Sequence, residues 1–144
     1  MKFRDFLLNE SEHTVQPGTK AELITIIEKT IKEKGNKCDL NFIDTSKITD
    51  MSGLFKNSKF NGNITEWDTS NVTDMSEMFM GTYYFNQPIG KWNTSKVKNM
   101  SGMFCGAVKF NKPIGNWDTS KVTDMTWMFD HSGLKGNEPN WYAD

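Results

Sequence analysis

Apolar positions recur along the chain at a nearly constant interval. A twelve-residue stretch with the same order of polar and apolar residues starts at Asp44, Asp68, Asn93 and Asp118, at intervals of 24, 25 and 25 residues. Its second copy reads DTSNVTDMSEMF, residues 68–79. A period of 20–50 residues is typical of an array in which each unit buries its apolar face only against its neighbours. The pattern therefore predicts a solenoid of about four stacked repeats.

Each full repeat has two halves, and the first half has the form Phe-Asn-x-x-Ile-x-x-Trp, as in Phe60, Ile64 and Trp67. The Ile-x-x-Trp-x-Thr segment resembles the L-x-x-L-x-L pattern of leucine-rich repeats, which forms a short strand stacked in parallel with its neighbours. Strand alternation predicts that Trp67 and Thr69 point inward, and that the neighbours Glu66, Asp68 and Ser70 point outward.

The second half, Met-Ser-x-Met-Phe, is predicted to form a short helical turn that glycines close at 81 and 106. The expected N-caps of these turns are Ser76, Ser101 and Thr126. The predicted fold class is therefore an α+β solenoid, a leucine-rich-repeat-like stack of about four 25-residue repeats with short parallel strands and an N-terminal helical cap.

Both ends of the array carry cap signals. Thr19 and Glu22 form a capping-box pattern, apolar residues follow at helical spacing up to Ile31, and Gly35 follows a lysine-rich last turn. We interpret 19–34 as a helix that covers the first repeat, with a membrane-surface or partner-binding helix as the alternative. A short helix is also expected over 1–8. Residues 134–144 resemble a degraded half-repeat, so the predicted segments are 1–37 (N-terminal cap), 38–133 (repeats) and 134–144 (C-terminal cap).

Composition limits the partners and the cellular compartment expected for this chain. The net charge is −1 and 36% of residues are hydrophobic, so the chain as a whole has no electrostatic drive toward nucleic acid or anionic membranes. No secretory signal or membrane-spanning run is recognised, which predicts a cytoplasmic protein with no membrane partner. The two cysteines, Cys38 and Cys105, are expected to be reduced and unpaired. A monomer is expected, because a closed stack exposes no strand edge in its middle.

Candidate chemistry is sparse, and no catalytic residue, cofactor or metal is predicted. Asp and Asn recur at two repeat positions: 44, 68, 93 and 118, and 50, 74, 99 and 124. A calcium ladder is one interpretation. Side-chain capping of tight turns is favoured, because the third repeat carries Asn at both positions and so keeps the acceptor while losing the charge. Asp130, His131 and Ser132 have the residue types of a triad, but adjacency in sequence does not give triad geometry.

The residues that break the repeat are the candidates for a binding surface. Trp127 stands where other repeats carry Gly or Glu, and Tyr83 and Tyr84 precede a repeat Phe. Phe42 stands at an outward position that Glu66 and Lys91 occupy in later repeats, and Glu66 and Lys91 are also candidate partner-binding residues. Exposed aromatic side chains are typical protein-binding anchors. The alternatives are that Trp127 packs on the C-terminal cap and that Phe42 packs on the N-terminal helix.

The function expected from these residues is a non-enzymatic protein–protein interaction module. An enzyme is the second class, and its signature would be a pocket joining Asp130, His131 and a nucleophile. The third class is nucleic-acid binding, through a partner or through a local stripe of lysines: Lys91, Lys96, Lys98, Lys109, Lys112 and Lys121.

The segments FNQPIGKWNTSKVKNMSGMF at 85–104 and FNKPIGNWDTSKVTDMTWMF at 110–129 resemble the repeats of BspA-like bacterial surface proteins and mycoplasma-type lipoproteins. This resemblance implies a leucine-rich-repeat-like fold, a role in adhesion or protein binding, and no catalytic residues. The leader MKFRDFLLNES resembles the start of small phage-encoded proteins. It implies a phage factor in the host-cell cytoplasm that inhibits a host defence protein by binding. The alternative is a fragment of an adhesin that binds an extracellular ligand.

Overall fold

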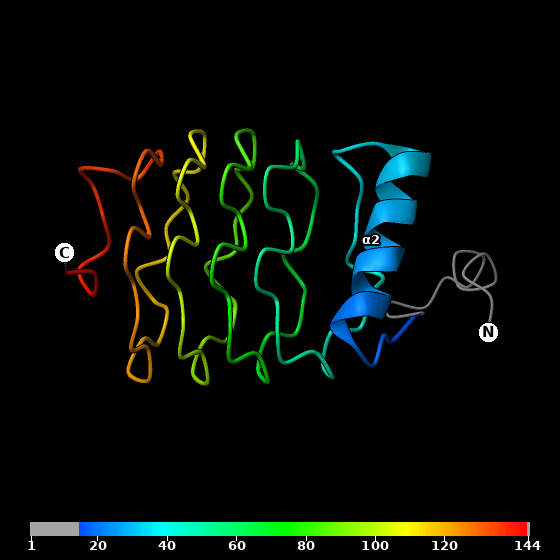
Figure 1. Cartoon of the computed structure of the whole chain (residues 1–144), viewed down its shortest axis with the longest axis horizontal. Coiled ribbons are helices and arrows are strands. Elements are labelled where there is room, and N and C mark those ends of the chain that lie inside the picture. Colours follow the sequence, from blue (N-terminus) through cyan, green and yellow to red (C-terminus); the bar gives the residue numbers. More distant parts are fainter. Residues whose placement is uncertain (1–14, 144) are drawn as a thin grey trace.

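The structure, a computed structural model, describes residues 15–143, and the helix expected over 1–8 lies outside this range. After the helix α2 (Lys20–Lys34), the chain winds into turns that lie side by side along the long axis of the molecule (Figure 1). One hydrophobic core runs through the stack from Leu23 in α2 to Leu134 near the C-terminus. The predicted array of stacked repeats is therefore present as a series of stacked turns.

The predicted α+β class with short parallel strands is wrong. Within residues 15–143, α2 is the one helix, and the contacts of sheet type are isolated parallel bridges such as Asp50 to Asp74 and Asp74 to Asn99. The segment expected to be a strand instead turns twice, since the Trp67 N–H donates to the Ile64 carbonyl and the Val72 N–H to the Thr69 carbonyl. Four-residue turns of this kind shorten the backbone, so no extended run can pair as a strand.

The inward and outward assignment of this segment is nevertheless confirmed for most positions. Trp67 and Thr69 are buried, and Glu66 and Asp68 are exposed, while Ser70 is half-buried. The Trp67 indole N–H donates to the Leu40 carbonyl of the preceding turn, at 3.0 Å. The same bond recurs in the later repeats, from Trp92, Trp117 and Trp141. Each tryptophan therefore fills the core and ties its turn to the one before.

The second half of each repeat pairs with its neighbours in an unusual way. Twelve backbone hydrogen bonds join residues 51–57, 75–81 and 100–106 to the following repeat, and in every one the earlier repeat donates its N–H to a carbonyl of the later one. Bonds in the opposite direction lie just before these segments, where Thr73, Lys98 and Thr123 donate to the preceding repeat. The donors are Met51, Gly53, Phe55 and Asn57, then Met75, Glu77, Phe79 and Gly81, then Met100, Gly102, Phe104 and Gly106. A β-strand presents N–H and C=O groups alternately to each side. We call this one-directional arrangement the polar ladder.

Backbone dihedrals explain the polar ladder. The four residues at one repeat position, Gly53, Glu77, Gly102 and Trp127, all have φ between 56° and 61°. The four at a second position, Asn57, Gly81, Gly106 and His131, have φ between 57° and 75°. Intervening N–H groups close turns within the repeat, as from Leu54 to the Met51 carbonyl. Alternate peptide groups are thus used inside the turn, and the remaining donors all face the next repeat.

Aromatic rings fill the space between the ladder and the tryptophan side of each turn. The Phe that ends one repeat stacks closely on the Phe that begins the next, with centroids 4.1 Å apart for Phe79 and Phe85. Between repeats the equivalent rings follow at 5.6–5.8 Å, from Phe55 through Phe79 and Phe104 to Phe129. The tryptophans form a parallel column with centroids 6.3–6.5 Å apart. These continuous stacks bring seven Phe and three Trp side chains into the buried core.

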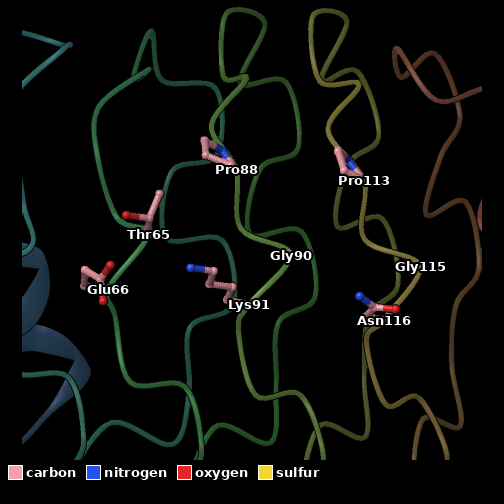
Figure 2. A pocket seen from close by; sticks show the side chains of 8 residues that line it. All are labelled: Thr65, Glu66, Pro88, Gly90, Lys91, Pro113, Gly115 and Asn116. Carbon is pink, nitrogen blue, oxygen red and sulfur yellow. The ribbon is translucent and has the colours of Figure 1, made fainter.

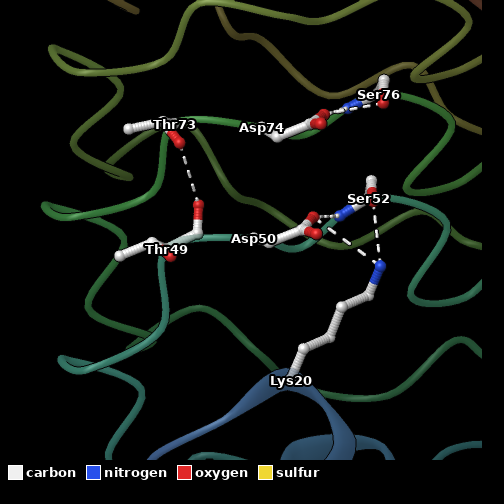
Figure 3. A network of polar contacts seen from close by, with 7 residues as sticks. All are labelled: Lys20, Thr49, Asp50, Ser52, Thr73, Asp74 and Ser76. Atoms are coloured by element: carbon white, nitrogen blue, oxygen red, sulfur yellow. Dashed lines mark hydrogen bonds and ion pairs between the residues drawn. The ribbon is translucent and has the colours of Figure 1, made fainter.

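The repeated Asp and Asn side chains cap turns, as predicted. At both repeat positions the Oδ1 atom accepts the backbone N–H two residues later, in all four repeats. The Ser76 hydroxyl also donates to Asp74, at 2.6 Å (Figure 3). The expected N-cap role of Ser76, Ser101 and Thr126 is wrong, because no helix other than α2 occurs within residues 15–143. The Asp or Asn side chain, not the following Ser or Thr, accepts the backbone N–H at these turns. A turn held in this way needs no helix after it.

Helix α2 closes the first turn, as the cap interpretation predicts. The Thr19 hydroxyl accepts the Glu22 N–H, which is one half of the predicted capping box. The Glu22 carboxylate accepts the N–H of Gly18, the residue before the N-cap, in place of the N–H of Thr19. Leu23 and Ile27 join the core. Lys20 reaches the first repeat, where its Nζ donates to Ser52 Oγ at 2.9 Å and lies 3.6 Å from Asp50 Oδ1 (Figure 3). Burial raises the pKa of Asp50, but the hydrogen bonds from Ser52 and the Lys20 charge outweigh it and hold that pKa below its usual value.

The half-repeat covers only part of the other end. Trp141 stacks on Trp117, and Tyr142 packs edge-on against Phe129 at 4.9 Å. Met125 and Val122 remain half-buried, whereas their counterparts Met100 and Val97 in the third repeat are fully buried. The C-terminal end of the stack is therefore less completely covered over 118–127 than any internal turn.

Candidate functional site

A shallow groove runs across three successive turns on the tryptophan side of the stack (Figure 2). Its volume is about 600 Å³, and it brings together Thr65, Glu66, Pro88, Gly90, Lys91, Pro113, Gly115 and Asn116. The groove unites Glu66 and Lys91, two of the candidate partner-binding residues, which occupy the same repeat position. Asn116, at that position in the next repeat, joins them. The groove thus offers a carboxylate, an ammonium and an amide in a row.

Proline and glycine shape this groove. Pro88 and Pro113 lack a backbone N–H, so they cannot donate a hydrogen bond to a neighbouring turn at that point. A Cβ at Gly90 would lie 2.7 Å from the Pro113 carbonyl oxygen, so only glycine permits the turns to approach this closely. The groove floor is therefore backbone, and its specificity resides in the side chains at 66, 91 and 116.

Tyr83 and Tyr84 form an exposed aromatic patch with Val108 and Lys109 of the next repeat. Tyr83 is 44% exposed, Tyr84 is 52% exposed and Val108 is 40% exposed. The two tyrosine rings meet edge-on at 4.9 Å, and the Lys109 ammonium lies 5.7 Å from the Tyr83 ring centre. The Lys109 N–H also donates to the Tyr83 carbonyl. The backbone beneath the patch is therefore fixed while its aromatic surface is in solvent.

Trp127 protrudes, as predicted, and is the most exposed large apolar side chain described, at 67%. It has a left-handed backbone conformation with φ of 59°. A bulky side chain rarely adopts this conformation, which glycine adopts readily at the same position in two other repeats. Trp127 lines a hollow of about 340 Å³ with Met125, Thr126, Asp130, Tyr142 and Ala143. The alternative of a Trp127 packed into the C-terminal cap does not fit this exposure.

Replacing Trp127 by Gly is expected to stabilise the fold. The left-handed conformation costs a non-glycine residue about 1 kcal/mol, and the largely exposed indole loses little packing on removal. The free energy of unfolding, measured by urea denaturation, should rise by about that amount. The matched reverse change is Gly53→Ala, which has the same φ and open space for a Cβ, and which should lower it by a similar amount. A loss of stability in Trp127→Gly would contradict the assignment of strain.

Most of the remaining candidate residues make contacts within the fold. Phe42 is half-buried and packs against the hydrophobic core, which includes Leu23 and Ile27 of α2. Ser132 is buried, and its hydroxyl accepts the Leu134 N–H, while the Asp130 carboxylate lies 3.8 Å from the Lys135 ammonium. These contacts do not assemble Asp130, His131 and Ser132 into a triad. Of the lysine stripe, Lys96 donates to Asn71 and Lys109 faces Tyr83.

Both cysteines are free thiols, as expected. Cys38 is buried and Cys105 is half-buried. Burial raises the pKa of each thiol, and Asp130 and Glu77 add to the effect at Cys105. A raised pKa keeps a thiol protonated and a poor nucleophile at neutral pH. Neither cysteine has the surroundings of a reactive thiolate.

These features define a repeat protein of stacked turns with a shallow groove and exposed aromatic side chains on its surface. The family model described as "Mycoplasma protein of unknown function, DUF285" matches residues 25–141, and the chain belongs to this family. This membership supports the coarser part of the resemblance, a placement related to the BspA-like repeat proteins. Comparison with curated proteins and with solved structures gives no match. Among the described residues, no helix is long and apolar enough to cross a bilayer.

Proposed function

We propose that this protein acts by binding another protein, and that the aromatic patch of Tyr83, Tyr84, Val108 and Lys109 is its anchor. The carrying observation is an exposed tyrosine pair in the middle of the array, where neither cap requires an aromatic side chain. Tyrosine supplies a large, rigid contact area at a low entropic cost, and is enriched among the residues that dominate interface energies.

The stack favours this role because its surface is preorganised. The Tyr83 and Tyr84 backbone lies between Thr82, whose hydroxyl donates to the Phe55 carbonyl, and Phe85, whose N–H donates to the Thr82 carbonyl. A rigid face loses little conformational freedom on association. The groove with Glu66, Lys91 and Asn116 supplies polar groups that can select a partner.

The test compares capture by the wild-type chain with capture by a Tyr83→Ala/Tyr84→Ala variant. A protein recovered in stoichiometric amount at high salt by the tagged wild type should bind the variant about tenfold or more weakly. The matched control is Lys121→Ala, an exposed change in the lysine stripe, which should leave affinity unchanged. Equal capture by the tyrosine variant would refute the patch as the anchor.

The nature of the captured partner separates the two settings that the resemblances imply. A host or bacterial cytoplasmic protein whose activity falls on binding would make this chain an inhibitor, as proposed for a phage-type factor. A ligand from the cell exterior would favour an adhesin-like module. Nucleic acid that dissociates as salt is raised would instead support the lysine stripe, because phosphate contacts are strongly salt-dependent.

A further inference from the structure

The polar ladder ends at the fourth repeat in a row of backbone donors. The positions equivalent to the donors of the third repeat are Met125, Trp127, Phe129 and His131. Within residues 15–143, the N–H groups of these four residues have no acceptor. The aligned peptide groups of the ladder add their dipoles, so this end carries partial positive charge. We name the row of four N–H groups the C-terminal edge.

The three preceding repeats show what such a row binds. In each of them the equivalent N–H groups donate to four alternate carbonyl oxygens of one polypeptide segment, as from Met100 to Asp124 at 2.9 Å and from Gly102 to Thr126 at 2.8 Å. A segment with its carbonyls on one side is therefore the complement of the C-terminal edge. A free anion is a poorer complement, because the Asp124 and Asp130 carboxylates belong to the same segment.

A second copy of the chain is also a poorer occupant. Within residues 15–143, its equivalent row of carbonyls without N–H donors is on the first repeat. That row lies on the side where α2 closes the stack and Lys20 contacts Ser52 and Asp50 (Figures 1 and 3). A segment of a different protein meets no such obstacle. The occupant that fits is thus an extended or turned polypeptide from a partner.

Trp127 adds a side-chain contact beside the C-terminal edge. Its N–H is one of the four donors, its indole is 67% exposed, and it lines the hollow that ends at Tyr142 and Ala143. Its left-handed backbone is strained in a position where glycine suffices elsewhere, and strain of this kind concentrates at functional sites. The indole is placed to cover an apolar side chain of a docked segment.

We propose that the C-terminal edge binds a polypeptide segment of a partner protein, which continues the stack as a further turn by accepting hydrogen bonds from the N–H groups of Met125, Trp127, Phe129 and His131. Main-chain bonds provide affinity and the Trp127 hollow provides selectivity, as in recognition by strand addition. The inference rests on the proposed protein-binding function but concerns a surface separate from the aromatic patch.

The probe is a peptide of residues 93–106 carrying Cys105→Ser, because 99–106 is the segment that the second repeat binds in this way. It is titrated into the full chain and followed by amide NMR. In the free chain the exposed Trp127 and His131 amides should exchange with solvent faster than their bonded counterparts at Gly102 and Gly106. Saturating peptide should shift all four edge amides and slow exchange at Trp127 and His131 about tenfold or more.

Two variants sharpen the test. Trp127→Gly keeps the four N–H groups, so the same amides should still shift, with about fivefold or greater loss of peptide affinity. Tyr83→Ala/Tyr84→Ala should bind the peptide with unchanged affinity, so failure of the edge and failure of the aromatic patch are distinguishable. Absence of shifts at the edge amides under saturation would overturn the proposal, as would equal binding of a scrambled peptide. The same shifts with inorganic phosphate alone would reassign the row as an anion site and overturn it too.

Discussion

Replacing Phe79 by Ala is expected to lower the free energy of unfolding by about 3–5 kcal/mol, the usual cost of removing a fully buried Phe. Phe79 is fully buried, and its ring stacks on four others, Phe55, Phe85, Trp92 and Phe104. With no extended sheet in the described chain, these ring stacks and the polar ladder join the turns. Urea denaturation followed by tryptophan fluorescence measures the change.

The matched control for Phe79→Ala is Tyr84→Ala, which removes an aromatic ring of similar size from the surface. Since Tyr84 is 52% exposed, its loss should change the free energy of unfolding by no more than about 0.5 kcal/mol. A loss below about 1 kcal/mol in Phe79→Ala would show that the backbone ladder, not the aromatic stack, carries the stability. The same denaturation measurement on Tyr83→Ala/Tyr84→Ala checks that the double variant used to test binding remains folded.

The sequence predicted the stacking and the core but not the backbone conformation. The period of 24–25 residues placed Trp67, Phe79 and their equivalents inside, where the structure has them. Burial depends mainly on which residues are apolar, and the repeat displays that directly. The strand prediction for Ile64–Thr69 failed because the same inward and outward pattern can be produced by consecutive tight turns, which the order of apolar residues does not distinguish from a strand.

The sequence does contain one signal for the turn conformation of the second half of the repeat. Gly53 and Gly102 occupy the same repeat position, and two glycines among four equivalents indicate a left-handed residue. Because Trp127 stands at the same repeat position, these glycines predict that its backbone is strained as well as that its side chain is exposed. The C-terminal edge could not be found in this way, because the direction in which N–H groups face depends on the alternation of dihedrals and on where the array ends, and no side-chain pattern encodes either.

The two ends of the polar ladder are chemically complementary. The first repeat presents the carbonyls of Asp50, Ser52, Leu54 and Lys56, which accept no N–H from the described residues, and the last repeat presents the four donors of the C-terminal edge. Complementary ends on one molecule permit open head-to-tail association, which does not close on itself. Helix α2 lies against the first turn and so stands in the way of this pairing (Figure 1).

Replacing Leu23 by Asp is therefore expected to release α2 and to let the chain form head-to-tail oligomers. Leu23 is fully buried, and an unpaired carboxylate there costs about 3 kcal/mol or more, enough to undock one helix from the stack. The uncovered carbonyls of the first repeat can then accept from the C-terminal edge of another copy. Analytical ultracentrifugation should show species that grow with concentration in steps of 16.5 kDa, and the 93–106 peptide should shorten them by occupying the edge.

The control is Ala21→Asp, which adds the same charge at an exposed position of the same helix and should remain monomeric. Retained native tryptophan fluorescence would show that the stack remains folded in Leu23→Asp. If the stack unfolds in that variant, the milder Ile27→Ala is used to weaken the packing of α2. A variant with α2 detached and the stack intact that stays monomeric at high concentration would contradict the complementarity of the two ends. Oligomers that the 93–106 peptide dissociates would use the same four N–H donors that the peptide occupies. Such oligomers would show that α2 prevents self-association, while the C-terminal edge stays accessible to a partner.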